Sequence, residues 1–213
     1  MGKIAQGILG GVSGKVGNVI GGSWKGIDYL RIKPSSVANP RTEGQVTQRN
    51  KFTAVLEFLQ PSRDFIRVGF KNYANGMTAF NYAMSITLAN AVTGDGLSAA
   101  VDYAAALLSR GSLNGALNPS VSSIESGVAT INWTDNSGGS NALATDKSLL
   151  LIYNPAKKSS IYTLEGDVRT AGTQSLTIPD SFIGDEVHVY MSFVSTDGKL
   201  VSNSTYLGAV TVA

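Results

Sequence analysis

The N-terminal stretch sets the terms for the fold of this chain, and it reads Gly7-Ile-Leu-Gly-Gly-Val-Ser-Gly-Lys-Val-Gly-Asn-Val-Ile-Gly-Gly-Ser-Trp-Lys-Gly-Ile-Asp-Tyr-Leu-Arg-Ile-Lys33. Nine of the 24 glycines lie between Gly2 and Gly26, so many positions carry no side chain. Such a stretch has too little apolar area for a core of its own, and backbones can approach closely at its glycines. We therefore expect an arm that pairs with something else.

Residues 16–33 favour extended structure. Glycine costs a helix interior about 1 kcal/mol, and four glycines lie in this stretch. In residues 27–32 successive side chains of a strand point to opposite faces, and this places apolar groups on both faces. Such a pattern is typical of a strand covered on both sides. A hairpin turn is expected near Gly21-Gly22 or Lys25-Gly26. The predicted assembly-interface residues of this arm are Gly14, Lys15, Val16, Gly17, Val19, Gly21, Gly22, Trp24, Lys25, Gly26, Tyr29, Arg31 and Arg41.

The composition describes a folded protein of low charge. Of its 213 residues, 43% are hydrophobic and 15% are charged, which argues against disorder. There is no cysteine, so disulfide and thiolate chemistry are excluded. With one histidine, a metal site built from several histidines is excluded as well. We expect no metal and no cofactor.

The net charge of +2 conceals a gradient along the chain. Residues 1–51 carry eight lysines and arginines against two acids, whereas residues 111–213 carry five against nine. A positive head could bind a polyanion, and it could equally attract the negative tail of another copy.

The sequence gives no reason to expect a membrane protein. The apolar run of residues 4–9 is interrupted at Gln6 and closed by Lys15, unlike a secretory signal. No run approaches the roughly 18 apolar residues of a membrane span. We expect synthesis in the cytoplasm, with release in an extracellular particle or filament as an option.

Three helices are expected between residues 34 and 114. Asn39 followed by Pro40 is a good helix start, and a helix is predicted from about Pro40 to Gln60. A second helix begins at Pro61, and a third is capped by Thr78 and ends at residues 94–96. Residues 99–108 are ambiguous and are interpreted as a connecting strand. The apolar residues expected to face the core of these helices are Phe52, Val55, Leu56, Leu59, Phe65, Ile66, Phe70, Tyr73, Phe80, Met84, Leu88 and Val92.

From about residue 116 the pattern becomes that of strands. Alternation predicts about seven short strands, a number typical of an immunoglobulin or fibronectin-like sandwich. The predicted fold class is α+β, with an N-terminal β-arm or hairpin (1–33), a helical segment (34–114) and a C-terminal β-sandwich (115–213). We expect residues 115–213 to fold alone. The later strands are predicted at residues 128–133, 148–153, 160–164, 174–178, 186–194 and 206–212.

Several segments resemble an uncharacterised family of Bacteroidota proteins of about this length, a domain of unknown function. These segments are residues 1–4, the GKVGNV run at 14–19, the SWKGID run at 23–28, the ANPRT run at 38–42, and residues 68–74. The resemblance is closest over residues 1–112. It implies a two-part chain, often in paralogous copies, and it supplies no catalytic residues.

Motifs of enzymes fail on inspection. A phosphate-binding loop requires glycine where Leu9 stands and serine or threonine where Val16 stands. His188 is expected to face outward from its strand, with no nucleophile evident beside it. Asp185 and Glu186 are adjacent, so on a strand they point to opposite faces and cannot readily act as a pair. We expect no enzymatic activity.

Three functions remain, in order of preference. The first is a non-enzymatic structural protein that self-assembles through its N-terminal arm, as in a filament or a phage-like particle. In that function the partner is the protein itself, because strand addition to a neighbour's sheet supplies affinity through main-chain hydrogen bonds. The second is nucleic-acid binding by the basic arm, with Trp24 and Tyr29 stacking on bases. The third is a carbohydrate- or surface-binding adhesin module.

Overall fold

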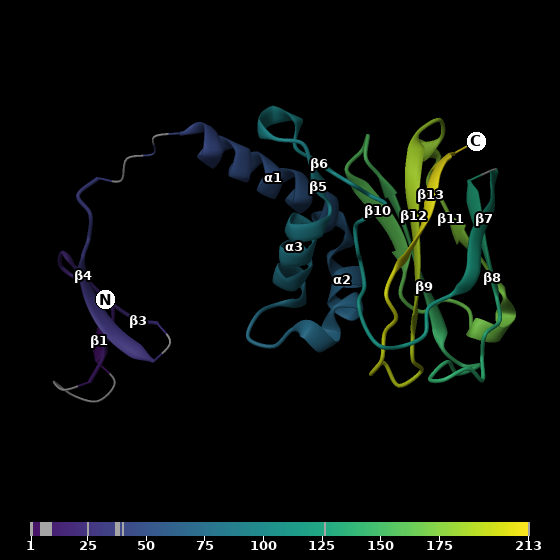
Figure 1. Ribbon diagram of the computed structural model, residues 1–213, viewed down its shortest axis with the longest axis horizontal. Coiled ribbons are helices and arrows are strands. Elements are labelled where there is room, and N and C mark those ends of the chain that lie inside the picture. The colour runs from purple at the N-terminus through teal and green to yellow at the C-terminus, as the bar shows by residue number, and fades with distance from the viewer. Residues whose placement is uncertain are drawn as a thin grey trace. The chain divides into compact units, whose positions relative to one another are not determined.

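The computed structural model describes residues 2–4, 10–24, 26–36, 39, 41–125 and 127–212, with the side chains of residues 4 and 122–125 left aside. The chain divides into two compact units, Met1–Arg41 and Thr42–Ala213. Most helices and strands of both units are labelled in Figure 1. The fold is α+β with a majority of strands, as predicted.

The first unit is an antiparallel sheet whose strands follow one another in chain order. The strands are β1 (Lys3–Ile4), β2 (Val12–Val16), β3 (Val19–Trp24) and β4 (Ile27–Ile32). The expected arm is therefore a small sheet of its own. Of the two turns proposed from the sequence, the one at Gly26 is present, with φ 80°. Gly21 and Gly22 instead lie inside β3 and pair with Leu30 and Tyr29.

Helices open the second unit. They are α1 (Glu43–Leu59), the 3₁₀ turn η1 (Gln60–Ser62), α2 (Arg63–Gly69), η2 (Lys71–Tyr73) and α3 (Ala79–Asn90). Thr78 caps α3 as predicted, since its hydroxyl accepts from the Asn81 N–H at 3.1 Å. The predicted start of α1 at Asn39-Pro40 is wrong. Thr42 is the N-cap, because Arg41 before it has a left-handed φ of 47° that helical residues do not adopt.

The connecting strand expected over residues 99–108 is reduced to a short pair. Strand β5 (Val92–Thr93) pairs with β6 (Ala100–Val101) around the turn η3 (Gly96–Ser98). The remainder is irregular but held by side chains. The Tyr190 hydroxyl donates to the Tyr103 carbonyl at 2.8 Å, and the Ser204 hydroxyl accepts from the Leu108 N–H at 2.9 Å.

Seven strands then form a sandwich. One sheet has the order β11-β8-β7 and the other the order β10-β9-β12-β13. In the immunoglobulin constant arrangement the fourth strand joins the first sheet; here the fourth, β10, pairs with β9, which is the fibronectin-like variant. The bounds are β7 (Leu117–Glu125), β8 (Val128–Thr134), β9 (Lys147–Asn154), β10 (Ser159–Thr163), β11 (Thr173–Thr177), β12 (Glu186–Val194) and β13 (Thr205–Thr211). Short 3₁₀ turns occur at η4 (Arg169–Ala171) and η5 (Asp180–Phe182).

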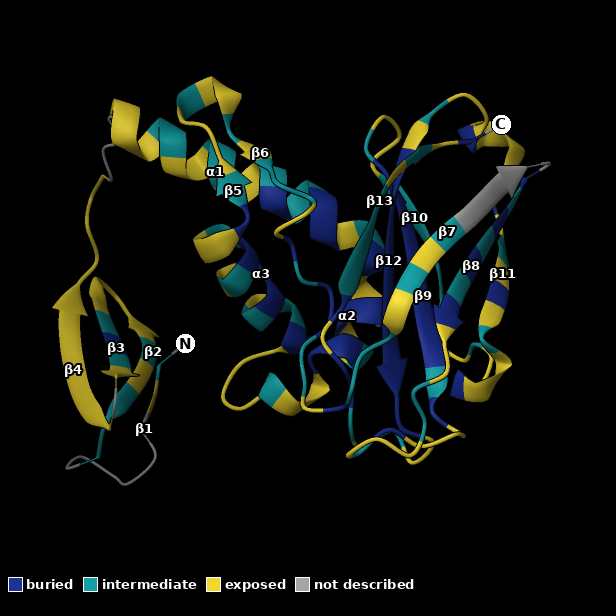
Figure 2. Ribbon diagram, turned by 45° about the vertical axis from the view of Figure 1, so that its right-hand side comes forward, coloured by how far each residue is buried: buried dark blue, intermediate teal, exposed yellow. Residues whose placement is uncertain are grey.

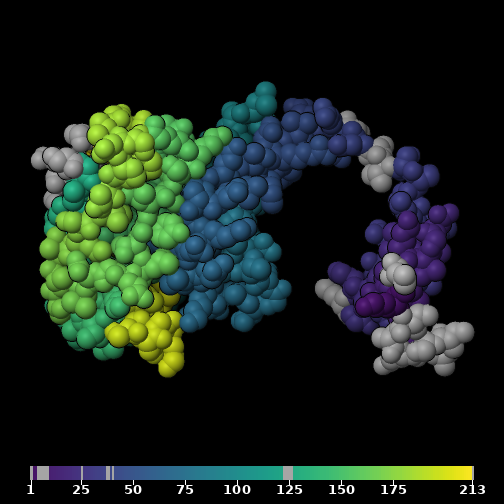
Figure 3. All heavy atoms as spheres, turned by 180° about the vertical axis from the view of Figure 1, so that it is seen from behind, coloured from purple at the N-terminus to yellow at the C-terminus, as the bar shows by residue number. Residues whose placement is uncertain are grey.

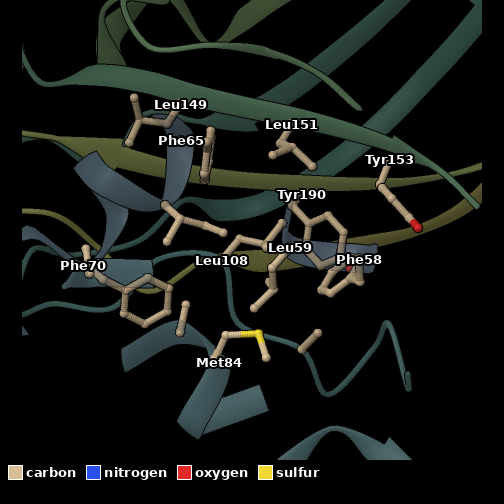
Figure 4. Close-up of a cluster of buried hydrophobic side chains, with 14 of the residues drawn as sticks. Phe58, Leu59, Phe65, Phe70, Met84, Leu108, Leu149, Leu151, Tyr153 and Tyr190 are labelled. Carbon is tan, nitrogen blue, oxygen red and sulfur yellow. The ribbon is translucent and has the colours of Figure 1, made fainter. Parts of the chain in front are cut away.

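The second unit has two hydrophobic cores, one on each face of the four-stranded sheet. The first lies between the two sheets of the sandwich and contains Ile131, Ile152 and Val189. The second lies between the other face and the helices (Figure 4). There the Phe58 ring meets the Tyr153 ring edge-on at 5.0 Å. The space-filling view shows the helical segment, in blue, directly against the sandwich (Figure 3).

Because both faces are covered, β9 and β12 are buried along almost their whole length (Figure 2). The predicted outward, exposed position of His188 is therefore wrong. Its side chain points away from the sandwich core as expected, but it is only 7% exposed. Its ring lies 4.0 Å from that of Tyr103, and its Nδ1 lies 2.9 Å from the Tyr206 hydroxyl.

Burial gives His188 an effect on the pH dependence of stability. Desolvation lowers the pKa of His188, against a smaller opposing effect of Glu186. The unfolded state therefore takes up its proton at a higher pH, near 6.5, and stability falls as the pH drops below that value. A His188→Gln variant is expected to show a flatter loss of stability just below pH 6.5 in urea unfolding. An unchanged slope would contradict the assignment.

Candidate assembly interface

Two tight turns shape the N-terminal sheet. Gly17, with φ 57°, precedes Asn18 between β2 and β3, and Gly26 turns the chain between β3 and β4. Both positions have a left-handed backbone that favours glycine, and a side chain at either would meet open space. The sequence thus sets the register of the hairpins through these two residues.

The glycines of β3 serve packing within the sheet. Gly21 is buried, and a Cβ there would overlap the carbonyl of Val12 in the neighbouring strand β2. Tyr29 lies over Gly22, with its hydroxyl 3.0 Å from where a Cβ would stand. The close approach expected from the glycines is therefore observed, but at these two positions the approaching group belongs to the same sheet.

One face of the sheet carries an aliphatic cluster. It consists of Val16, Val19, Leu30 and Ile32, which are 56%, 38%, 62% and 78% exposed. The register places Val16 opposite Val19, Val19 opposite Ile32, and Leu30 opposite Gly21, so all four share a face. This aliphatic cluster lies toward the Gly17 turn.

The opposite face carries an aromatic cluster at the other end of the sheet. It consists of Trp24, Ile27 and Tyr29, which are 65%, 67% and 45% exposed. Trp24 pairs with Ile27, and Tyr29 pairs with Gly22. Lys15 and Arg31 lie on the same face, one on each side of Ile20. This face thus combines aromatic and basic groups, whereas Asp28 belongs to the aliphatic face.

The β4 edge of the sheet has no neighbouring strand among the described residues. Strand β4 is the last in the sheet and is exposed along its whole length, as Figure 2 shows in yellow. Its outer backbone groups can pair with a strand from another chain. Charged side chains on an edge strand usually discourage such pairing. Strand β4 has two of them, Asp28 and Arg31, and its other four residues are exposed and apolar or aromatic.

The sheet brings together most of the residues predicted for the interface. Gly14, Lys15 and Val16 lie in β2, with Gly14 paired to Gly21. Arg41 is not part of the sheet, since it lies at the end of the unit before α1. Lys25 lies outside the described residues.

The prediction omitted three of the most exposed apolar residues, Ile27, Leu30 and Ile32. Their alternation within β4 could have identified them, because it places apolar groups on both faces.

Charge differs in sign between the two units. Residues 1–41 contain six basic residues against Asp28, whereas residues 42–213 contain eleven basic and fourteen acidic residues. The net charges are therefore +5 for residues 1–41 and −3 for residues 42–213.

The second unit also has hollows on its surface. A cavity of about 450 Å³ is lined by Arg63, Arg67, Lys71 and Phe80, among others. The Arg63 guanidinium lies over the Phe80 ring, 5.5 Å from its centroid. Arg67 pairs with Asp64 at 3.3 Å, and Lys71 donates to the Gly198 carbonyl at 3.3 Å.

Within the described ranges, no group of three or more histidines and carboxylates is arranged to hold a metal ion. None of the helices in the described part of the chain is long and apolar enough to cross a membrane.

No curated protein matches the chain. A family model matches residues 11–208, which include the sheet from β2 onward, the helices and nearly all of the sandwich. The chain therefore belongs to this family, described as a family of unknown function (DUF6266).

Proposed function

We propose that this protein is a non-enzymatic structural protein that assembles with copies of itself through its N-terminal sheet. The observation that carries the proposal is the exposure of apolar side chains on both faces of that sheet. A soluble monomer rarely leaves a contiguous group of large apolar side chains uncovered. The free edge of β4 offers main-chain hydrogen bonds to a strand of another chain.

The opposite charges of the two units support a second copy as the partner. They steer one chain's basic unit toward another chain's acidic unit, and this preference is the same for every copy. A filament or a phage-like particle component is the kind of assembly that such a head-to-tail preference favours, because a heterologous contact that does not close builds an open chain.

The experiment is sedimentation velocity of the full chain at micromolar concentration, with negative-stain microscopy of the same sample. We expect species larger than the monomer. A variant lacking residues 1–33 should remain monomeric because it lacks the N-terminal sheet. It should still fold because it keeps the whole second unit. A full chain that stays monomeric at physiological salt would exclude the proposal.

A second function, binding of single-stranded nucleic acid, is favoured by one observation. Lys15 and Arg31 share a face with Trp24 and Tyr29, and aromatic stacking beside backbone-tracking cations is how such proteins bind. Oligonucleotide binding that weakens steeply with salt, and that a Lys15→Gln/Arg31→Gln variant loses, would support it. Strand pairing between copies has no such salt dependence.

A further inference from the structure

The N-terminal sheet has two separate apolar clusters, and we infer that both of its faces are covered by other copies of the chain in the assembly. This inference rests on the proposed function and adds to it the number of contacts that each sheet makes. The aliphatic cluster would lie against one surface and the aromatic cluster against another.

The position of the clusters argues against a single contact. They lie on opposite faces, so one flat surface cannot touch both. They also lie at opposite ends of β3, where Val19 pairs with Ile32 and Trp24 pairs with Ile27. Five residues separate the two ends, which is about 17 Å along a strand. Each cluster therefore needs its own covering surface.

The size of the sheet supports the use of both faces. Its four strands contain 2, 5, 6 and 6 residues. At about 16 Å² of sheet per residue, one face covers only about 300 Å². A stable interface needs about 800 Å² from each partner. One face alone is therefore too small to hold a neighbour stably, and contacts on both faces and along the edge of β4 add to the total area that each sheet contributes to the assembly.

Charge favours another copy as the occupant. The aromatic face carries Lys15 and Arg31, while the acid of this unit, Asp28, lies on the other face. The second unit of every chain has more acidic than basic residues, as such a face requires. None of the four residues of the aliphatic cluster is charged, and Asp28 lies toward the other end of that face, so the cluster itself can pack on an apolar surface.

A matched pair of variants of the full chain tests the inference. Leu30→Thr/Ile32→Thr removes apolar groups from one face, and Trp24→Thr/Ile27→Thr removes them from the other. The four residues have similar exposure, between 62% and 78%. Threonine is favoured in strands, so the sheet is expected to persist. Leu97→Thr/Ile183→Thr is the control, because both residues are exposed on the second unit.

The measurement is the protein concentration at which half of the chains are assembled, by sedimentation. Each face variant is expected to raise it about tenfold or more, and the control should leave it unchanged. Hydrogen exchange of the β3 amides reports whether the sheet is intact. If a double variant loses that protection, the single changes Ile32→Thr and Ile27→Thr take its place.

The possible results separate the inference from the proposed function. If the wild type assembles and one face variant behaves like it, only one face is used and the inference is overturned, while self-assembly stands. If the aromatic-face variant loses only oligonucleotide binding, that face serves nucleic acid and the inference is again overturned. A wild type that never assembles removes the proposed function itself.

Discussion

An Arg169→Ala variant is expected to lose about 3–5 kcal/mol of its free energy of unfolding, the cost of breaking a buried ion pair from one side. Arg169 and Asp146 are both fully buried, and the Arg169 Nη2 lies 3.1 Å from the Asp146 Oδ2. Removing the guanidinium leaves this carboxylate uncompensated inside the protein. Since a domain has only about 5–15 kcal/mol of stability, the loss is a large share of the total.

The Arg169 guanidinium also connects two other segments of the chain, residues 114–115 and the loop at Asn136. It donates to the carbonyls of Asn114 and Gly115 at 2.9 and 3.1 Å and to the Asn136 side chain at 2.7 Å. It stacks on the Phe193 ring, 3.8 Å from its centroid. Alanine would remove the donor to the Asn114 carbonyl and to the Asn136 side-chain oxygen, whereas the Gly115 carbonyl also accepts from Asn136 Nδ2 at 3.1 Å. An acceptor left unpaired adds to the cost.

The matched control is the exposed pair of Arg67 and Asp64, at 3.3 Å. An Arg67→Ala variant should cost about 0–1 kcal/mol, because exposed ion pairs contribute little. Both free energies are measured by urea unfolding. If Arg169→Ala costs no more than Arg67→Ala, the buried pair does not have the structural role assigned to it. An Arg169→Lys variant should recover only part of the loss, since lysine lacks the planar fork.

Local patterns predicted the elements better than their packing. Strand β12 was predicted with its bounds, because its residues alternate between apolar and other types. The burial of His188 was not predicted, because alternation alone does not reveal that Tyr103, in the segment after β6, covers this part of the second face. Phe58 was missed for the same reason. It is 1% exposed in α1, where the buried face is widened by contact with Tyr153 and Tyr190 of the sheet.

The candidate interface was also predicted only in part from the sequence. The sequence indicated an arm that needs a partner, and the exposed faces of its sheet agree with that interpretation. The function of Gly21 could not be predicted, since its neighbour Val12 is identified only by the pairing of β2 with β3. A substitution of Gly17 or Gly21 by valine would therefore disturb the sheet itself, and exposed positions such as Ile32 give a cleaner test of assembly.

The helices and the four-stranded sheet share one hydrophobic core, so a fragment that separates them should lose stability. From the sequence, residues 115–213 were expected to fold alone. In the structure, residues 42–213 form one compact unit, and the helices together with residues 101–108 pack against one face of the β10-β9-β12-β13 sheet. A fragment of residues 115–213 would expose that face.

We now expect the 115–213 fragment to aggregate or to lack a cooperative unfolding transition, whereas a 42–213 fragment should unfold cooperatively as a monomer. Four side chains lose their cover, Leu149, Leu151, Tyr153 and Tyr190, all 3% exposed or less in the whole chain. At roughly 1.5–3 kcal/mol each, they represent roughly 6–12 kcal/mol of lost burial. That is comparable to the whole stability of a domain.

The shorter fragment also loses groups from the inner core and from the Arg169 site. Leu113, 4% exposed, packs between the sheets, and the carbonyl of Asn114 accepts from Arg169. Thermal unfolding followed by circular dichroism, with sedimentation of both fragments, is the measurement. A monomeric 115–213 fragment that unfolds at the same temperature as 42–213 would show that the sandwich is stable without the helices. The sandwich would then be stable with this face of the sheet exposed to solvent, and the helices would not be required for its folding.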